Sequence, residues 1–72
     1  MERIDCRGLS CPLPVVETRK HLEILPSGGK IEVLVDTGTA RDNVSRLAQR
    51  EGCSVEVRET ENEEFILTIT RK

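Results

Sequence analysis

The stretch from residue 30 to residue 52 constrains the fold more than any other part of the chain. Its first half, KIEVLVD, alternates the apolar Ile31, Val33 and Val35 with Glu32 and Leu34. Alternation with a period of two predicts a β-strand with one buried face. The residues that follow change to a helical period, so the stretch reads as a strand leading directly into a helix.

The helical part of this stretch is TARDNVSRLAQREG. Its apolar residues recur at i, i+4, i+7 and i+8, which places them on one face of a helix: Ala40, Val44, Leu47 and Ala48. We expect Thr39 to be the N-cap and Asp42 to lie in the first turn, where a carboxylate interacts favourably with the helix dipole. Gly52 follows the last periodic residue, at the position where a left-handed C-cap residue is common.

The N-terminal part of the chain repeats this order. Apolar and charged residues alternate over 3–7, which predicts a short first strand. A helix is expected over residues 12–25, with Val15, Leu22 and Leu25 on its buried face. Proline and glycine residues over 26–29 then end this helix.

The C-terminal part predicts two more strands, over residues 54–58 and 64–71. The polar sequence TENE between them indicates a hairpin, and Phe65, Leu67 and Ile69 share one face. The whole chain therefore reads as β-α-β-α-β-β. We expect a single domain over residues 1–72, an α+β two-layer sandwich with both helices on one face of the sheet.

The opposite face of the predicted sheet is too mixed for a second core. It carries charged, polar and apolar side chains: Glu32, Leu34, Glu56, Arg58, Ile66 and Thr68. Two readings remain open for this face, because half-polar sheet faces are commonly solvated but can also contact a partner.

Composition excludes several functional classes. The formal net charge of −2 lacks the basic footprint of a nucleic-acid binder, and the lone aromatic residue, Phe65, gives no surface for base stacking. No apolar run approaches the roughly 18 residues of a membrane span, and the N-terminus is charged. We therefore expect a cytoplasmic monomer that binds neither nucleic acid nor membrane.

The chain has three cysteines, Cys6, Cys11 and Cys53. An odd number this small does not build a disulfide scaffold, so free thiols in a reducing compartment are the simpler interpretation. Cys6 shares a strand face with Ile4 and is expected to be buried, the alternative being a resolving thiol that pairs with Cys11. Cys53 follows Gly52 and is expected in the core or a turn.

Cys11 precedes two prolines in the sequence SCPLPV. With Cys11 as N-cap, Pro12, Leu13 and Pro14 occupy the first turn, where amide groups have no acceptor within the helix. The prolines then start the helix without losing a hydrogen bond, and the thiol faces the positive end of the helix dipole. Ser10 is the alternative cap, which leaves Cys11 without this role.

A reactive Cys11 requires a lowered pKa. From a free thiol pKa of about 8.5, half ionisation at neutral pH takes about 2 kcal/mol, and a sheltered helix N-terminus supplies up to about that amount. Arg7 or Arg41 can add to it. If the first two strands are parallel neighbours, Asp36 and Thr39 lie near Cys11 at the same edge of the sheet.

The residues Asp5, Gly8-Leu9 and the CPxP unit Cys11–Pro14, followed by Val15, resemble the signature of the TusA/SirA/YedF family of small sulfur-carrier proteins. The likeness covers nearly the whole chain. SRLAQREGCSVEV is similar to the N-terminal half of YedF-type proteins. The resemblance implies the fold of the C-terminal domain of translation initiation factor three, a four-stranded mixed sheet with two helices on one side.

The resemblance also implies a function. The family's CPxP cysteine, here Cys11, accepts sulfane sulfur from a cysteine desulfurase or another donor protein and hands it to an acceptor protein thiol. This is sulfurtransferase chemistry on a protein persulfide, without a cofactor, and Gly8, Pro12, Leu13 and Pro14 support the cysteine. Family destinations include tRNA thiolation, sulfur oxidation, cofactor assembly and selenium metabolism. The alternatives are a selenium-linked YedF-like domain and a non-catalytic binding or regulatory module.

Two further features of the sequence are candidate sites. His21 and the three cysteines offer four zinc ligands, but no CxxC pair is present and we expect no metal site. His21 is expected at the surface. The acidic run ETENEE (59–64) is read as a solvated hairpin, with a partner contact as the alternative.

Overall fold

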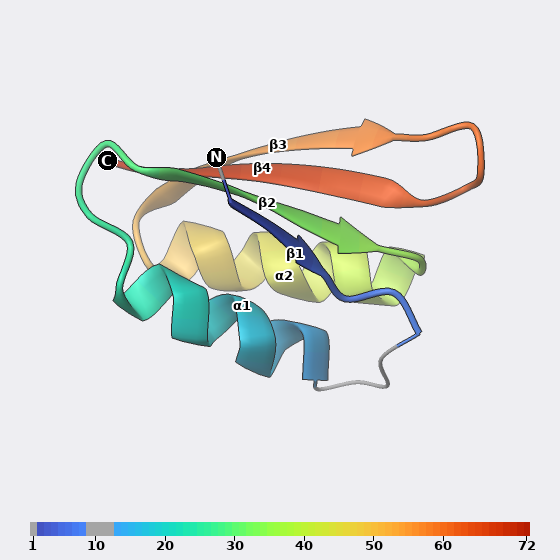
Figure 1. Cartoon of the computed structure of the whole chain (residues 1–72), viewed down its shortest axis with the longest axis horizontal. Coiled ribbons are helices and arrows are strands. Elements are labelled where there is room, and N and C mark those ends of the chain that lie inside the picture. The colour runs from blue at the N-terminus through green and yellow to red at the C-terminus, as the bar shows by residue number, and fades with distance from the viewer. Residues whose placement is uncertain (1, 9–12) are drawn as a thin grey trace.

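The strands and helices lie in two layers, with the sheet on one side and both helices on the other (Figure 1). The computed structural model describes residues 2–8 and 13–72. Its elements follow the predicted order: β1 (Glu2–Asp5), α1 (Leu13–Glu23), β2 (Lys30–Val35), α2 (Gly38–Arg50), β3 (Cys53–Glu59) and β4 (Phe65–Arg71). The predicted α+β two-layer sandwich is confirmed.

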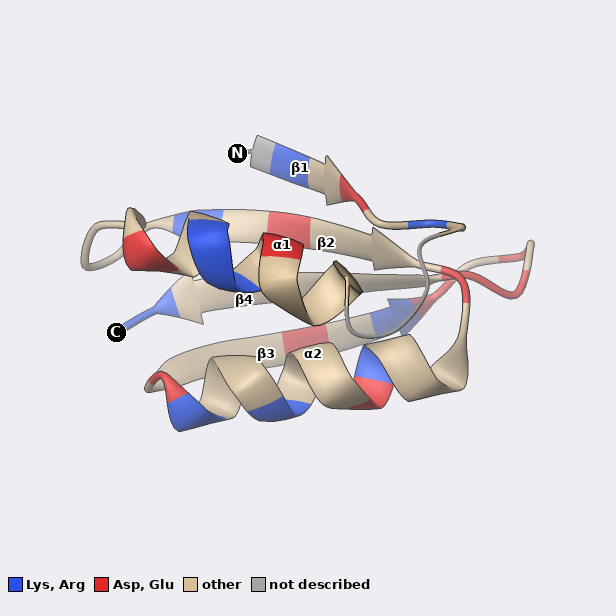
Figure 2. Ribbon diagram, turned by 90° about the horizontal axis from the view of Figure 1, so that it is seen from below, with Lys and Arg blue, Asp and Glu red and all other residues tan. Residues whose placement is uncertain are grey.

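The strand order in the sheet is β1-β2-β4-β3. β1 pairs in parallel with β2, from Glu2 opposite Ile31 to Asp5 opposite Leu34. β4 runs antiparallel to both β2 and β3, so the sheet is mixed, as expected. Figure 2 shows this arrangement from the helix side. Because β1, β2 and β3 run in the same direction, their carboxyl ends meet at one edge of the sheet.

The core lies between the sheet and the helices. Ile31, Val33 and Val35 of β2 are buried as the alternation predicted, and so are Leu67 and Ile69 of β4. The remaining buried apolar residues come from every other element or its end: Ile4, Cys6, Leu22, Val44, Leu47, Ala48 and Cys53. Burial of these side chains provides the main driving force for folding.

The buried stripe of α1 differs from the prediction. Pro14, Thr18 and Leu22 are its buried residues, whereas Val15 and Leu25 are only partly buried. Thr18 is inaccessible to solvent, and its hydroxyl donates to the carbonyl of Pro14 at 2.8 Å. A threonine that satisfies its hydroxyl within its own helix can pack in an apolar environment. Because threonine is polar, the pattern of apolar residues did not predict its burial.

α1 ends at Glu23, two residues before the predicted end. Pro26 disfavours helical geometry at Leu25, and the Leu25 amide donates instead to the Leu22 carbonyl, three residues back, at 3.2 Å. The Arg71 guanidinium also donates to the Leu22 carbonyl, at 2.5 Å. A cation at the C-terminal end of a helix complements its dipole. The end of β4 thereby fixes the end of α1.

The predicted start of α2 was wrong. Thr37, and not Thr39, is the N-cap, and its hydroxyl accepts the amide of Ala40 at 3.0 Å. The connection from β2 comprises only residues 36–37, so the chain leaves the extended conformation at Thr37. Since the helix begins earlier than expected, Asp42 falls beyond its first turn.

The predicted signals at the two chain reversals after α2 are confirmed. Gly52, which follows α2, has a φ of +80°, in the left-handed region where glycine is favoured. The hairpin between β3 and β4 turns over residues 60–63, with Glu63 at a φ of +62°. The run 59–64 is thus the hairpin that the sequence predicted.

The open face of the sheet has the expected mixed character. Glu32 and Thr68 lie opposite each other across β2 and β4, as do Leu34 and Ile66. Arg3 pairs with Glu32 at 3.1 Å at the β1 side of this face. The row through Leu34 and Ile66 is flanked by Asp5 and Arg58, and no described element covers this face.

Candidate functional site

The segment that carries the candidate cysteine runs between the end of β1 and the start of α1. Cys11 and Pro12 lie outside the described residues, so the capping hypothesis stays a prediction. Both flanks are described. Gly8 precedes the segment, and Leu13 and Pro14 follow it in the first turn of α1.

The described start of α1 suits a proline. Pro14 is buried in the first turn, where its missing N–H removes no helical hydrogen bond. Leu13 beside it is exposed, with 46% of its surface accessible. The prediction that proline is accommodated at the beginning of this helix is confirmed for Pro14.

The residues that lead from β1 into the Cys11 segment are each held by a different contact. The Cys6 amide donates to the carbonyl of Leu34 at 2.8 Å, which extends the contact with β2 past the end of β1. The Gly8 amide donates to Oδ2 of Asp36 at 3.0 Å. Gly8 has a φ of +76°, a conformation that side-chain-bearing residues rarely adopt. Residues 6–8, hereafter the stem, are therefore anchored to the carboxyl end of β2.

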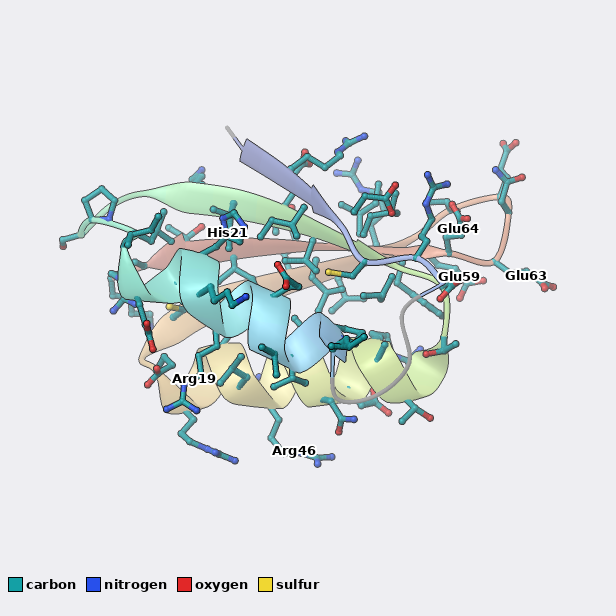
Figure 3. All side chains as sticks on the ribbon, turned by 60° about the horizontal axis from the view of Figure 1, so that its bottom comes forward. Arg19, His21, Arg46, Glu59, Glu63 and Glu64 are labelled. Carbon is teal, nitrogen blue, oxygen red and sulfur yellow. The ribbon has the colours of Figure 1, made fainter. Side chains whose placement is uncertain are left out.

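Arg7, the middle residue of the stem, forms two ion pairs. Its Nη2 lies 2.9 Å from Oδ2 of Asp5, and its Nη1 lies 3.3 Å from Oε2 of Glu64. Figure 3 labels Glu64 at the edge of the sheet where the hairpin and the end of β1 meet. The hydrogen bonds from Arg7 lower the pKa of Asp5 to about 2, so this pair is intact at neutral pH.

Of the three predicted neighbours of Cys11, only Asp36 contacts the stem. Thr39 is exposed in the first turn of α2. The Arg41 guanidinium lies over the Phe65 ring, 4.6 Å from its centroid, and its Nε donates to Oδ1 of Asp42 at 2.9 Å. The bond to Asp42 raises the pKa of Arg41, so the cation is retained but its charge is compensated.

The same compensation applies to Arg7. Both arginines that were candidates to stabilise a Cys11 thiolate are already paired with carboxylates. A compensated cation exerts a much weaker field at a distance than a free one. The capping hypothesis for Cys11 therefore depends on the dipole of α1 and not on these two arginines.

The structure places the other two thiols in the core. Cys6 is 1% exposed and Cys53 is 5% exposed, and both are free. Burial of Cys6 agrees with the expected small apolar role on the face it shares with Ile4. Across residues 2–8 and 13–72, no three His, Cys, Asp or Glu side chains converge as metal ligands. His21 is partly buried on α1.

Burial raises the pKa of the Cys6 thiol above its ordinary value. The unfolded chain therefore loses this proton at a lower pH than the folded chain. Stability from Cys6 is fully present below the unfolded thiol pKa of about 8.5 and is lost as the pH rises from there through the folded pKa. We expect the midpoint of thermal unfolding to fall from pH 8 to pH 10 by less in Cys6→Ala than in the wild type. Equal falls in the two proteins would contradict this linkage.

Sequence reasoning missed the two ion pairs of the stem. Asp5 and Arg7 share a strand face two residues apart, which is a detectable signal for the first pair. Arg7 and Glu64 are 57 positions apart, and no local pattern connects them. Only the sheet order, which brings the ends of β1 and β3 to one edge, places them together.

A mixed four-stranded sheet with two helices on one face is the fold of small SirA-like domains. A solved SirA-like protein of Desulfitobacterium hafniense has this fold, with a TM-score of 0.88 and 35% identity over 97% of this chain and 96% of that one. The family model described as Sulfurtransferase TusA matches residues 2–71. The chain belongs to the TusA family of sulfur carrier proteins.

Relatives with related names support the same conclusion. A candidate sulfur carrier protein of Methanocaldococcus jannaschii is 35% identical over 71 residues, covering 99% of this chain and 95% of that protein. The sulfur carrier protein TusA of Pseudomonas fluorescens is 42% identical over 40 residues, covering 54% of this chain and 48% of that one. No helix in the described part of the chain is long and apolar enough to cross a membrane.

Proposed function

We propose that Cys11 carries the sulfur, as a persulfide, between a donor protein and an acceptor protein. One observation supports this choice most directly: Cys6 and Cys53 are buried in the core. A carrier thiol must reach the cysteine of another protein, and two of the three thiols have no such access. Cys11 is the remaining one, and it stands in the CPxP sequence at the start of α1.

The proposed reaction is an exchange at sulfur. The Cys11 thiolate attacks the terminal sulfur of the donor's persulfide, and a new S–S bond forms as the donor's S–S bond breaks. The donor cysteine leaves as a thiolate, and the proton on the transferred sulfur stays with it. The second half repeats the step, with the acceptor thiolate attacking the terminal sulfur on Cys11. No external oxidant or reductant is consumed, because one persulfide replaces another.

A cysteine desulfurase is the proposed donor, and a protein with a reactive cysteine is the proposed acceptor. We place this exchange in the reducing cytoplasm, where thiols persist, and treat residues 1–72 as one carrier unit. The proposed destinations of the sulfur include tRNA thiolation and selenium metabolism, according to the acceptor.

Intact mass spectrometry tests the proposal. After incubation with a cysteine desulfurase and cysteine, the protein should gain the mass of one sulfur atom, and reductant should remove it. Peptide mapping should place the sulfur on Cys11. Failure to gain sulfur from any donor tested, or sulfur found on Cys6 or Cys53, would rule the proposal out.

A further inference from the structure

We propose that Asp36 is a positioning residue for Cys11. Its carboxylate holds the turn from which the Cys11 segment leaves the sheet, and thereby limits where the sulfur can lie during transfer. This inference rests on the proposed function of Cys11. It assigns Asp36 no contact with the transferred sulfur.

The contact itself joins two distant parts of the chain. The Gly8 amide donates to Oδ2 of Asp36 at 3.0 Å, across 28 positions of sequence. Asp36 directly follows β2, and Gly8 stands three residues beyond the end of β1. A hydrogen bond to a charged acceptor is stronger than one between neutral groups. The bond therefore anchors Gly8 to the residue after β2, beyond the point where the pairing of β1 and β2 ends.

The stem shows why a side chain is needed here. The backbone contact between the parallel strands continues only as far as the Cys6 amide, which donates to Leu34 at 2.8 Å. The next residue, Arg7, directs its guanidinium to ion pairs with Asp5 and Glu64. The Gly8 amide has passed the last backbone acceptor of β2, and the Asp36 carboxylate replaces that acceptor.

Covalent reach converts this anchor into a limit on Cys11. Consecutive Cα atoms are about 3.8 Å apart, so Cys11 lies within about 11 Å of Gly8 and about 8 Å of Leu13. Leu13 is fixed by α1, and Gly8 is fixed by Asp36. Without the Asp36 bond, the nearest bond to β2 before Cys11 is that of the Cys6 amide, five residues away and not three, so this limit loosens while α1 and the core remain in place. The sulfur then samples more positions relative to a docked partner.

Transfer requires the attacking thiolate, the terminal sulfur and the leaving thiolate to be in line. Misplacement by about 1 Å can cost roughly 100-fold in rate, so loss of one of two anchors is expected to slow transfer at least about tenfold. The effect should fall on the rate constant within the docked complex. Affinity for the donor should change only as much as it does on losing any one carboxylate at this edge.

Three variants separate the hydrogen bond from the charge. Asp36→Ala removes both, whereas Asp36→Asn keeps an acceptor oxygen for the Gly8 amide and removes the charge. Glu61→Ala is the matched control, because it removes an exposed carboxylate from the hairpin at the same edge without touching the stem. Single-turnover loading by a persulfide-bearing cysteine desulfurase is measured over a range of donor concentrations. Alkylation of Cys6, buried in the wild type, reports any loss of fold.

We expect the saturated loading rate to fall at least about tenfold in Asp36→Ala and to stay within about threefold of the wild type in Asp36→Asn and Glu61→Ala. Cys6 should stay unmodified in all three. A wild-type rate in Asp36→Ala would overturn the proposal, and so would equal losses in Asp36→Ala and Asp36→Asn, which indicate a charge effect. Exposure of Cys6 in Asp36→Ala would assign the residue to stability instead. Absence of loading in the wild type would refute the function of Cys11, and this inference with it.

Discussion

Cys11→Ser is expected to fold like the wild type and to gain no sulfur from any donor. A serine oxygen cannot hold a sulfane sulfur as a persulfide, and its hydroxyl is not ionised at neutral pH. Serine is also among the most favourable N-cap residues, so the start of α1 should lose no stability. Intact mass after incubation with a cysteine desulfurase and cysteine measures the first effect, and thermal unfolding measures the second.

The matched controls are Cys6→Ala and Cys53→Ala. Each removes a thiol that the structure buries in the core, and each should still gain one sulfur atom while it remains folded. Their unfolding midpoints are expected to fall, because each leaves a small cavity. Sulfur loading on Cys11→Ser at the wild-type level, or its loss in both alanine variants at a temperature where they are folded, would refute the assignment of the carrier thiol to Cys11.

Leu67→Ala is expected to bring the domain close to unfolding. Leu67 is fully buried in β4, which pairs with strands on both sides, and truncation of such a leucine costs about 2–5 kcal/mol. Small domains have only about 5–15 kcal/mol of stability in total, and short chains lie toward the lower end. Denaturant unfolding measures the loss.

The neighbouring residue provides the control. Ile66 lies on the opposite, open face of the same strand and is only partly buried. Ile66→Ala removes apolar surface from the same strand but leaves no cavity in the core, so its cost should be well below that of Leu67→Ala. Similar losses from the two substitutions would contradict the placement of the core on the helix side of the sheet.

Local periodicity was enough to predict the arrangement of the elements. The alternation of β2, the apolar face of α2 and the turn at Gly52 are properties of neighbouring residues, and each was found where it was expected. The boundaries were less certain, because two threonines compete to cap α2. The short connection from β2 selects Thr37, and the sequence contains no local signal for that choice.

The contacts around the site depend on tertiary structure. Asp36 was expected near Cys11 from the parallel pairing of β1 and β2, but its bond to the Gly8 amide was not. The Arg7–Glu64 pair depends on the sheet order, and the burial of Thr18 depends on a hydroxyl bonding within its own helix. Such contacts join residues far apart in the chain or reverse the usual preference of a residue type.

The position of β1 at the border of the sheet affects how the domain opens. β1 pairs with one neighbour over four residues, whereas β4 pairs along its length with β2 and β3. We therefore expect the amides of β1 to exchange hydrogen faster than those of β4. Partial opening of β1 leaves the pairing of β2, β4 and β3 in place. The stem continues this border strand into the Cys11 segment. The cysteine thus follows the strand with the shortest pairing in the sheet, and the burial of Ile4 and Cys6 opposes its opening.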